Sequence, residues 1–128
     1  MSRRSSFTIP PFGTCGGGAI ELIEAVSLAP ERVEKRFSGP RPGIHHVAYA
    51  VPPTEVADLR SSLDERGLPQ YLSSQLGAVD ATLHDASAAL GHDIEIHVDS
   101  EGLRGFFGMV SGAAEGWDGS EPLRPVES

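Results

Sequence analysis

The sequence lacks the features that mark several large classes of protein. It contains one cysteine, Cys15, so no disulfide can form within the chain, and no second cysteine stands at metal or redox spacing. No apolar run approaches the roughly 18–20 residues that are needed to cross a bilayer, and the N-terminus has no apolar stretch typical of a secretory signal. We therefore expect a cytoplasmic protein with no membrane-spanning segment.

Positive charge is also scarce. Ten Lys and Arg residues face 18 Asp and Glu residues, which gives a net charge of −8 at pH 7. A polyanion is repelled by such a field, and no basic stripe along the chain offsets it. The sequence therefore predicts no nucleic-acid partner. Beyond this, the acidic balance indicates only solubility.

Glycine and proline are abundant by contrast, with 15 and 10 copies that gather near the two ends of the 128 residues. Such stretches punctuate a chain rather than build its core. The length is enough for one ordinary domain. The expected organisation is an irregular N-terminal arm, a strand and linker, a folded module and an extended tail. Their bounds are 1–18, 19–42, 43–114 and 115–128.

The middle of the chain alternates strand and helix patterns. Residues 44–51 (IHHVAYAV) are rich in β-branched and aromatic side chains and end at two prolines, which predicts a strand. A helix should follow, with Thr54 as its N-cap and Gly67 at its end. Two strands are expected over 68–76 and 79–86, a third over 93–99, and a closing helix over 103–114. The fold class is therefore α+β, a βαβββ module with a mainly antiparallel curved sheet.

Alternation along the strands places the polar side chains on defined faces. His46 shares a face with Ala48 and Ala50, and these small neighbours leave room for a ligand. In the strand DIEIHVD at 93–99, Glu95 and His97 share the face opposite the isoleucines. We expect that His97 could line the same cavity as Glu95. The remaining histidines are expected in packing or at the surface: His45, which should point away from His46, and His84 and His92, which stand near strand ends.

A short internal similarity links the two halves of the chain. AIELIEA at 19–25 and DIEIHVD at 93–99 share the string Ile-Glu followed by Leu or Ile. Residues 19–25 would then be the last strand of a preceding copy of the module, with Glu21 at the position of Glu95. The alternative is that two short strings match by chance, and the sequence leaves both interpretations open.

The order of these strings resembles a known family. The stretch IELIEA, a linker ending Pro42-Gly43, IHHVAYAV, a helix ending Glu65-Arg66-Gly67, and GHDIEI at 91–96 together resemble the vicinal oxygen chelate superfamily. The nearest branches are the glyoxalase-like and methylmalonyl-CoA-epimerase-like proteins. The resemblance covers about 80 of the 128 residues. It implies two βαβββ modules around a divalent metal ion, of which this chain would hold one module and a remnant strand of the other.

The resemblance also implies a ligand set. His46 matches the first-strand ligand of the second module, Glu95 its fourth-strand ligand, and Glu21 the fourth-strand ligand of the first module. Glu95 would double as the catalytic base. The strand that would carry a fourth ligand has no counterpart. Independently of the family, one imidazole and two carboxylates suit a borderline or hard divalent ion such as Zn, Ni, Co, Mn or Fe.

Two functions from different classes follow as expectations. The first is a metal-dependent lyase or isomerase that acts on a small oxygenated metabolite by stabilising an enolate. The second is a binding or sequestration protein on the same scaffold, similar to the drug-binding members of the superfamily. A third interpretation is an inactive product that lacks its first module. Because one module cannot close the sheet alone, a homodimer is also expected.

Overall fold

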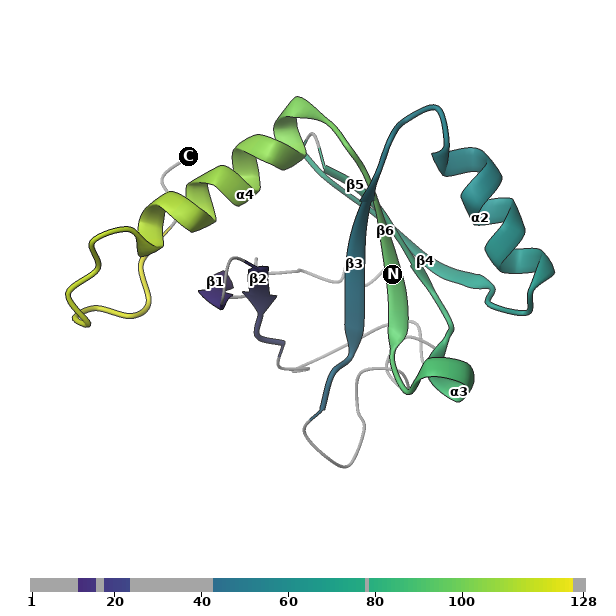
Figure 1. Ribbon diagram of the computed structural model, residues 1–128, viewed down its shortest axis with the longest axis horizontal. Coiled ribbons are helices and arrows are strands. Elements are labelled where there is room, and N and C mark those ends of the chain that lie inside the picture. Colours follow the sequence, from purple (N-terminus) through teal and green to yellow (C-terminus); the bar gives the residue numbers. More distant parts are fainter. Residues whose placement is uncertain (1–11, 16–17, 24–42, 78, 126–128) are drawn as a thin grey trace, which may run out of the picture.

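The fold centres on a four-stranded mixed sheet (Figure 1). The computed structural model describes residues 12–15, 18–23, 43–77 and 79–125. The strands are β3 (His46–Val51), β4 (Gln70–Leu76), β5 (Val79–His84) and β6 (Asp93–Val98), in the spatial order β3-β6-β5-β4. β5 runs antiparallel to β4 and β6, whereas β3 and β6 are parallel. The predicted α+β class and βαβββ pattern are confirmed, and the first and last strands of the module lie side by side.

Two helices frame this sheet. α2 (Val56–Glu65) follows β3, and α4 (Glu101–Ala114) follows β6, with the short α3 (Ser87–Leu90) between β5 and β6. The prediction of Thr54 as the N-cap of α2 is wrong: the cap is Glu55, because a turn in which Glu55 N donates to Pro52 O delays the helix. Ser100 caps α4, accepting from Leu103 N at 3.1 Å. No helix within the described ranges is long and apolar enough to cross a membrane.

The hydrophobic core lies between α2 and one face of the sheet. Its buried members come from β3, α2 and β6: Val51, Val56, Leu63 and Ile96. Ile94 and Val98 pack against the same cluster, so the apolar side of the alternating strand 93–99 faces α2. The polar residues of β6 therefore face the other side of the sheet, away from α2.

A separate two-stranded hairpin lies on that other side. β1 (Phe12–Cys15) and β2 (Gly18–Glu21) are antiparallel, and Glu21 stands opposite Phe12. β1 falls inside the stretch expected to be irregular, and β2 is the strand expected from residue 19 onward. The linker is expected to end at residue 42, and residues 24–42 lie outside the part of the chain that the structure describes. The hairpin contacts α4, where the rings of Phe12 and Phe106 meet edge to face at 5.0 Å.

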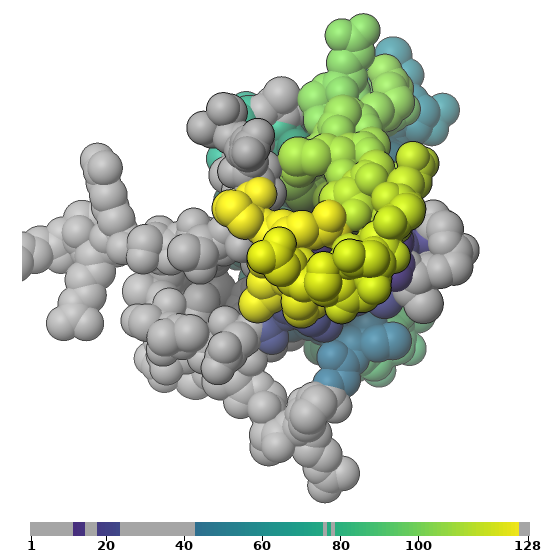
Figure 2. All heavy atoms as spheres, turned by 90° about the vertical axis from the view of Figure 1, so that its left-hand side faces the viewer, coloured from purple at the N-terminus to yellow at the C-terminus, as the bar shows by residue number. Residues whose placement is uncertain are grey.

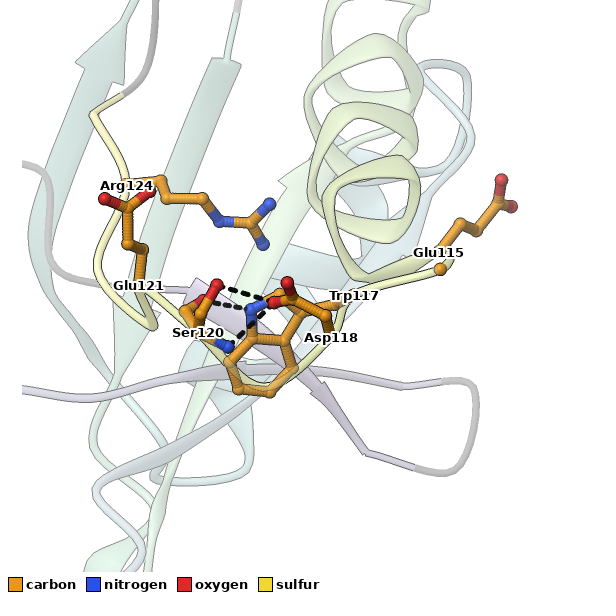
Figure 3. A pocket seen from close by; sticks show the side chains of 7 residues that line it. Glu115, Trp117, Asp118, Ser120, Glu121 and Arg124 are labelled. Atoms are coloured by element: carbon orange, nitrogen blue, oxygen red, sulfur yellow. Dashed lines mark hydrogen bonds between the residues drawn. The ribbon is translucent and has the colours of Figure 1, made fainter.

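Residues 115–125 follow α4 and are exposed throughout. Figure 2 shows this segment, in yellow, at the surface on the side of the molecule where the hairpin also lies. The segment is turned rather than extended, because Asp118 Oδ1 accepts from both the backbone N and the hydroxyl of Ser120. Trp117 Nε1 donates to the Ser120 carbonyl (Figure 3). Arg124 Nη2 donates to the carbonyl of Ala113 at 2.6 Å. The side chains drawn in Figure 3 line an open hollow that follows the C-terminal end of α4.

Candidate metal centre

Three side chains from three different strands meet on the sheet face that points away from α2. Nε2 of His46 lies 3.1 Å from an Oε atom of Glu21 and 3.0 Å from Oε2 of Glu95. The three potential ligand atoms all lie within 4.8 Å of one another, and each residue is half-buried. The sequence analysis singled out these same three residues, and the structure brings them together as a cluster that could hold a metal ion.

The register of β3 and β6 explains how His46 and Glu95 meet. His46 stands opposite Asp93, and Ala48 stands opposite Glu95, so all four side chains project to one face. Ala48 is exposed and has only a methyl group. The Glu95 side chain can therefore lean across it toward the imidazole. The parallel pairing of β3 with β6, which the βαβββ order produces, is what places the two ligands on adjacent strands.

Glu21 reaches the centre from the hairpin and not from the main sheet. It is the last residue of β2, and the strand-pairing hydrogen bonds of β2 go to β1. Besides the Glu21–His46 contact, the aromatic contact between Phe12 and Phe106 connects the hairpin to the rest of the fold. The position of this ligand consequently depends on how the hairpin docks against α4.

His97 is a further neighbour of the triad. It stands opposite Ala50 on β3 and shares the face of Glu95. Its Nε2 contacts Oε1 of Glu95, and its ring packs against Phe107 at 6.2 Å between centroids. His97 is 9% exposed and lies on the same face as Glu95, as strand alternation predicts. Glu95 therefore presents one oxygen to His46 and the other to His97.

His45 lies behind His46, which sequence reasoning missed. The two Nδ1 atoms are 2.9 Å apart, and the rings meet edge to face at 5.2 Å. The expectation that His45 points away from His46 is wrong, because β3 begins at His46 and strand alternation does not govern the residue before it. The one feature of the sequence that could have indicated this contact is the adjacent His-His pair.

Asp93 is a buried carboxylate next to His45. It is 3% exposed and accepts hydrogen bonds from the Tyr71 hydroxyl at 2.6 Å and from Ala86 N at 3.3 Å. Its Oδ2 lies 4.0 Å from Nε2 of His45, and its backbone N donates to the His45 carbonyl at 2.8 Å. A buried carboxylate held in this way has a fixed orientation toward the histidine pair.

The two carboxylates tune the imidazole between them. Burial alone would lower the pKa of His46, but the hydrogen bond to Glu21 and the charges of Glu95, Glu21 and Asp93 outweigh it and raise the pKa above 6.5. For Glu95, burial alone would raise the pKa, but the hydrogen bond from His97 and the charges of His46 and His97 lower it below 4.5. Without a metal ion, both shifts favour the charged forms of His46 and Glu95.

His84 has a structural role. The expectation of a surface position is wrong, because His84 is fully buried on β5. Its Nδ1 lies 3.3 Å from the Leu68 carbonyl, its Nε2 lies 3.2 Å from the Thr82 hydroxyl, and Arg60 Nε donates to that hydroxyl at 3.0 Å. Both ring nitrogens are satisfied, and burial lowers the pKa of His84, so it remains a neutral core residue.

The donor set fits a divalent cation. One imidazole nitrogen and two carboxylate oxygens are ligands that Zn²⁺, Mn²⁺ or Ni²⁺ accept. Ligand atoms at about 2.1 Å from a tetrahedral ion stand about 3.4 Å apart. Two separations in the cluster are 3.0 and 3.1 Å and all three are within 4.8 Å, which is compatible with that geometry. Three protein ligands would leave at least one coordination position for another ligand.

Comparison with known proteins adds no relative. No family model, no curated protein and no solved structure matches the chain. The structure alone therefore supports the four-stranded mixed sheet with its separate hairpin and the Glu21–His46–Glu95 cluster.

Proposed function

We propose that this protein is a divalent-metal-dependent lyase or isomerase of the vicinal-oxygen-chelate kind that acts on a small oxygenated metabolite. The observation that carries the proposal is the convergence of Glu21, His46 and Glu95 on one face of a βαβββ sheet, within 4.8 Å of one another. The order β3-β6-β5-β4 makes the first and last strands neighbours, as a pair of first-strand and fourth-strand ligands requires.

The bound ion would supply Lewis-acid chemistry, polarising a substrate carbonyl so that an enolate becomes accessible. The residues of the chain supply the rest. His46 would hold the ion, and Glu95 would take a proton from the carbon beside the carbonyl. The contact of His97 with Oε1 of Glu95 fixes the orientation of that carboxylate. Ala48 and Ala50 are exposed beside the ligands and leave space for a substrate.

We further propose that the working assembly is a homodimer. Among the strands that the structure describes, β3 is an edge strand of the four-stranded sheet, and none of them pairs along its outer edge. Ile44 and Tyr49, at or near this strand, are 71% and 52% exposed. Pairing with a second copy would cover these side chains and extend the sheet around the centre.

Proton exchange at carbon tests the enzyme proposal. The metal-loaded protein is incubated in deuterated water with 2-hydroxy ketones, hemithioacetals and acyl thioesters, and loss of the C–H signal beside the carbonyl is followed by NMR. We expect metal-dependent exchange with at least one class, reduced at least about 100-fold in Glu95→Gln. The matched control is Glu101→Gln, which removes an exposed carboxylate on α4.

The opposite pattern would favour sequestration. If the metal-loaded protein exchanges no C–H proton in any class, yet the metal-free protein still binds one of these compounds, the centre does not perform this chemistry. Binding without metal would then identify a small-molecule carrier on the same scaffold.

A further inference from the structure

We infer that His45 and Asp93 form a positioning relay behind His46, which holds the His46 ring in the tautomer that can bind a metal ion. The inference deepens the proposed metal centre and rests on it. Neither residue reaches the ion itself; both would act through the ring of His46.

The relay starts from the contact between the two imidazoles. Their Nδ1 atoms are 2.9 Å apart, and the His45 and His46 side chains are 19% and 12% exposed. Two ring nitrogens at this distance can share only one hydrogen atom, so one nitrogen donates and the other is bare. The position of the proton on one neutral ring therefore determines its position on the other.

A metal ion selects one of the two arrangements. To bind through Nε2, His46 must carry its proton on Nδ1, which then donates to a bare Nδ1 of His45. The neutral His45 must in turn carry its proton on Nε2. That nitrogen lies 4.0 Å from Oδ2 of Asp93, beyond hydrogen-bond distance but near enough for the carboxylate charge to favour an N–H over a lone pair.

The reverse arrangement is disfavoured by Asp93. If His45 donated from Nδ1, its Nε2 would present a lone pair to the Asp93 carboxylate, and His46 would hold its proton on the nitrogen needed for the metal. Asp93 is 3% exposed, and at low local dielectric this electrostatic difference is larger than it would be in water. Asp93 thus biases the pair toward the tautomer that can bind metal.

The orientation of Asp93 is fixed by its other contacts. The Tyr71 hydroxyl donates to Oδ2 at 2.6 Å, Ala86 N donates to Oδ1 at 3.3 Å, and Asp93 N donates to the His45 carbonyl at 2.8 Å. The backbone bond ties the start of β6 to the residue that precedes β3. These bonds hold the Asp93 carboxylate in place beside His45.

Two substitutions at His45 separate this role from simple packing. His45→Phe keeps an aromatic ring against His46 but has no acceptor, whereas His45→Asn loses the ring and keeps an oxygen near the position of Nδ1. If His45 only packs, Phe is the benign change and Asn the harmful one. If His45 accepts the His46 proton, the order is reversed.

The measurement is Zn²⁺ affinity by chelator competition on the full chain. We expect binding to weaken about 10–100-fold in His45→Phe and to stay within about threefold of the unsubstituted protein in His45→Asn. Unchanged affinity in His45→Phe, or affinity in His45→Asn as weak as in His45→Phe, would overturn the relay.

A second readout needs no metal and so distinguishes failure of the relay from failure of the metal centre. Nitrogen-15 NMR of the histidine rings in the metal-free protein, at a pH high enough to make His46 neutral, should show the His45 proton on Nε2, with Nδ1 as an acceptor, and Asp93→Asn should weaken that preference. A His45 proton on Nδ1 in the unsubstituted protein would overturn the relay even if Zn²⁺ binds. Absence of Zn²⁺ binding with the expected ring pattern would contradict the proposed function and leave the relay standing.

Discussion

Glu95 and His46 meet diagonally across two parallel strands. Their side chains come within 3.0 Å although the residue opposite Glu95 is Ala48, and the residue opposite His46 is Asp93. Diagonal neighbours in a sheet are farther apart than direct ones, so the contact depends on the reach of a glutamate and on a small side chain at the opposite position. The small side chain of Ala48 therefore permits the contact between Glu95 and His46.

Enlarging that alanine should obstruct the site without harming the fold. In Ala48→Leu, the added side chain occupies the space through which Glu95 leans toward His46. Because Ala48 is exposed, the melting temperature should change little. We expect Zn²⁺ affinity to fall at least about tenfold, measured by chelator competition. Ala57→Leu, at an exposed position of α2, is the matched control, and equal affinities in the two variants would show that the space beside Ala48 is not used.

The docking of the hairpin should be coupled to metal binding. Phe106→Ala removes the edge-to-face contact with Phe12 that connects the hairpin to α4. Because Glu21 is on that hairpin, the substitution should weaken Zn²⁺ binding through loss of the Glu21 ligand. In a double-mutant cycle with Glu21→Gln, the two effects should be strongly non-additive.

Additive effects in that cycle would mean that Phe106 and Glu21 act independently. A direct measurement supports the cycle: in hydrogen exchange, the amides of β1 and β2 should become more protected when Zn²⁺ is added. The amides of α2, which lies on the other face of the sheet, provide the internal reference.

The metal-free protein should be most stabilised by this cluster at mildly acidic pH. The folded pKa of His46 is raised above 6.5, so its contribution is complete below pH 6.5 and is lost as pH rises through the raised pKa. The folded pKa of Glu95 is lowered below 4.5, so its contribution is present above pH 4.5 and is lost as pH falls through the lowered pKa. The window of greatest stabilisation lies between these two values.

Thermal melting with chelator present measures this dependence. The unsubstituted protein should lose more stability than His46→Gln as the pH rises from about 6 to about 9. Parallel pH profiles for the two proteins would contradict the charged cluster inferred for the metal-free state.

His84 should be important for stability and irrelevant to metal. His84→Leu keeps a side chain of similar size but removes both ring nitrogens, which leaves the Leu68 carbonyl without this partner and disturbs the bond from Arg60 to Thr82. We expect a loss of about 1–3 kcal/mol in the free energy of unfolding, measured with urea. Zn²⁺ affinity of the folded variant should be unchanged, and a clear loss of affinity would indicate that His84 communicates with the centre.

Strand alternation and strand order predict most of the fold. The apolar side of 93–99 identifies the face that α2 covers, and the βαβββ order leads to the neighbouring positions of β3 and β6. Glu21, which the sequence analysis singled out, joins His46 and Glu95 in the cluster, although it comes from the separate hairpin. The sheet itself follows from local periodicity and strand order, which a sequence displays directly.

The positions of His45 and Asp93 beside the centre are not predictable in the same way. His45 precedes the strand, so alternation assigns it to the wrong side, and Asp93 looks like one more polar residue of an alternating strand. Its burial depends on Tyr71 and Ala86, which are distant in sequence. The hairpin partner of β2 also escapes prediction, because glycine-rich residues 13–18 resemble a loop.

Metal stoichiometry tests the central claim most directly. Purified protein, stripped with chelator and reloaded with Zn²⁺, Ni²⁺, Co²⁺ or Mn²⁺, is desalted and its metal content is measured by mass spectrometry. We predict about one ion per chain for at least one of these metals, lost on His46→Ala or Glu95→Gln and retained in the control Glu101→Gln. No retained ion with any of the four metals, or an ion retained equally well in His46→Ala, would contradict the account.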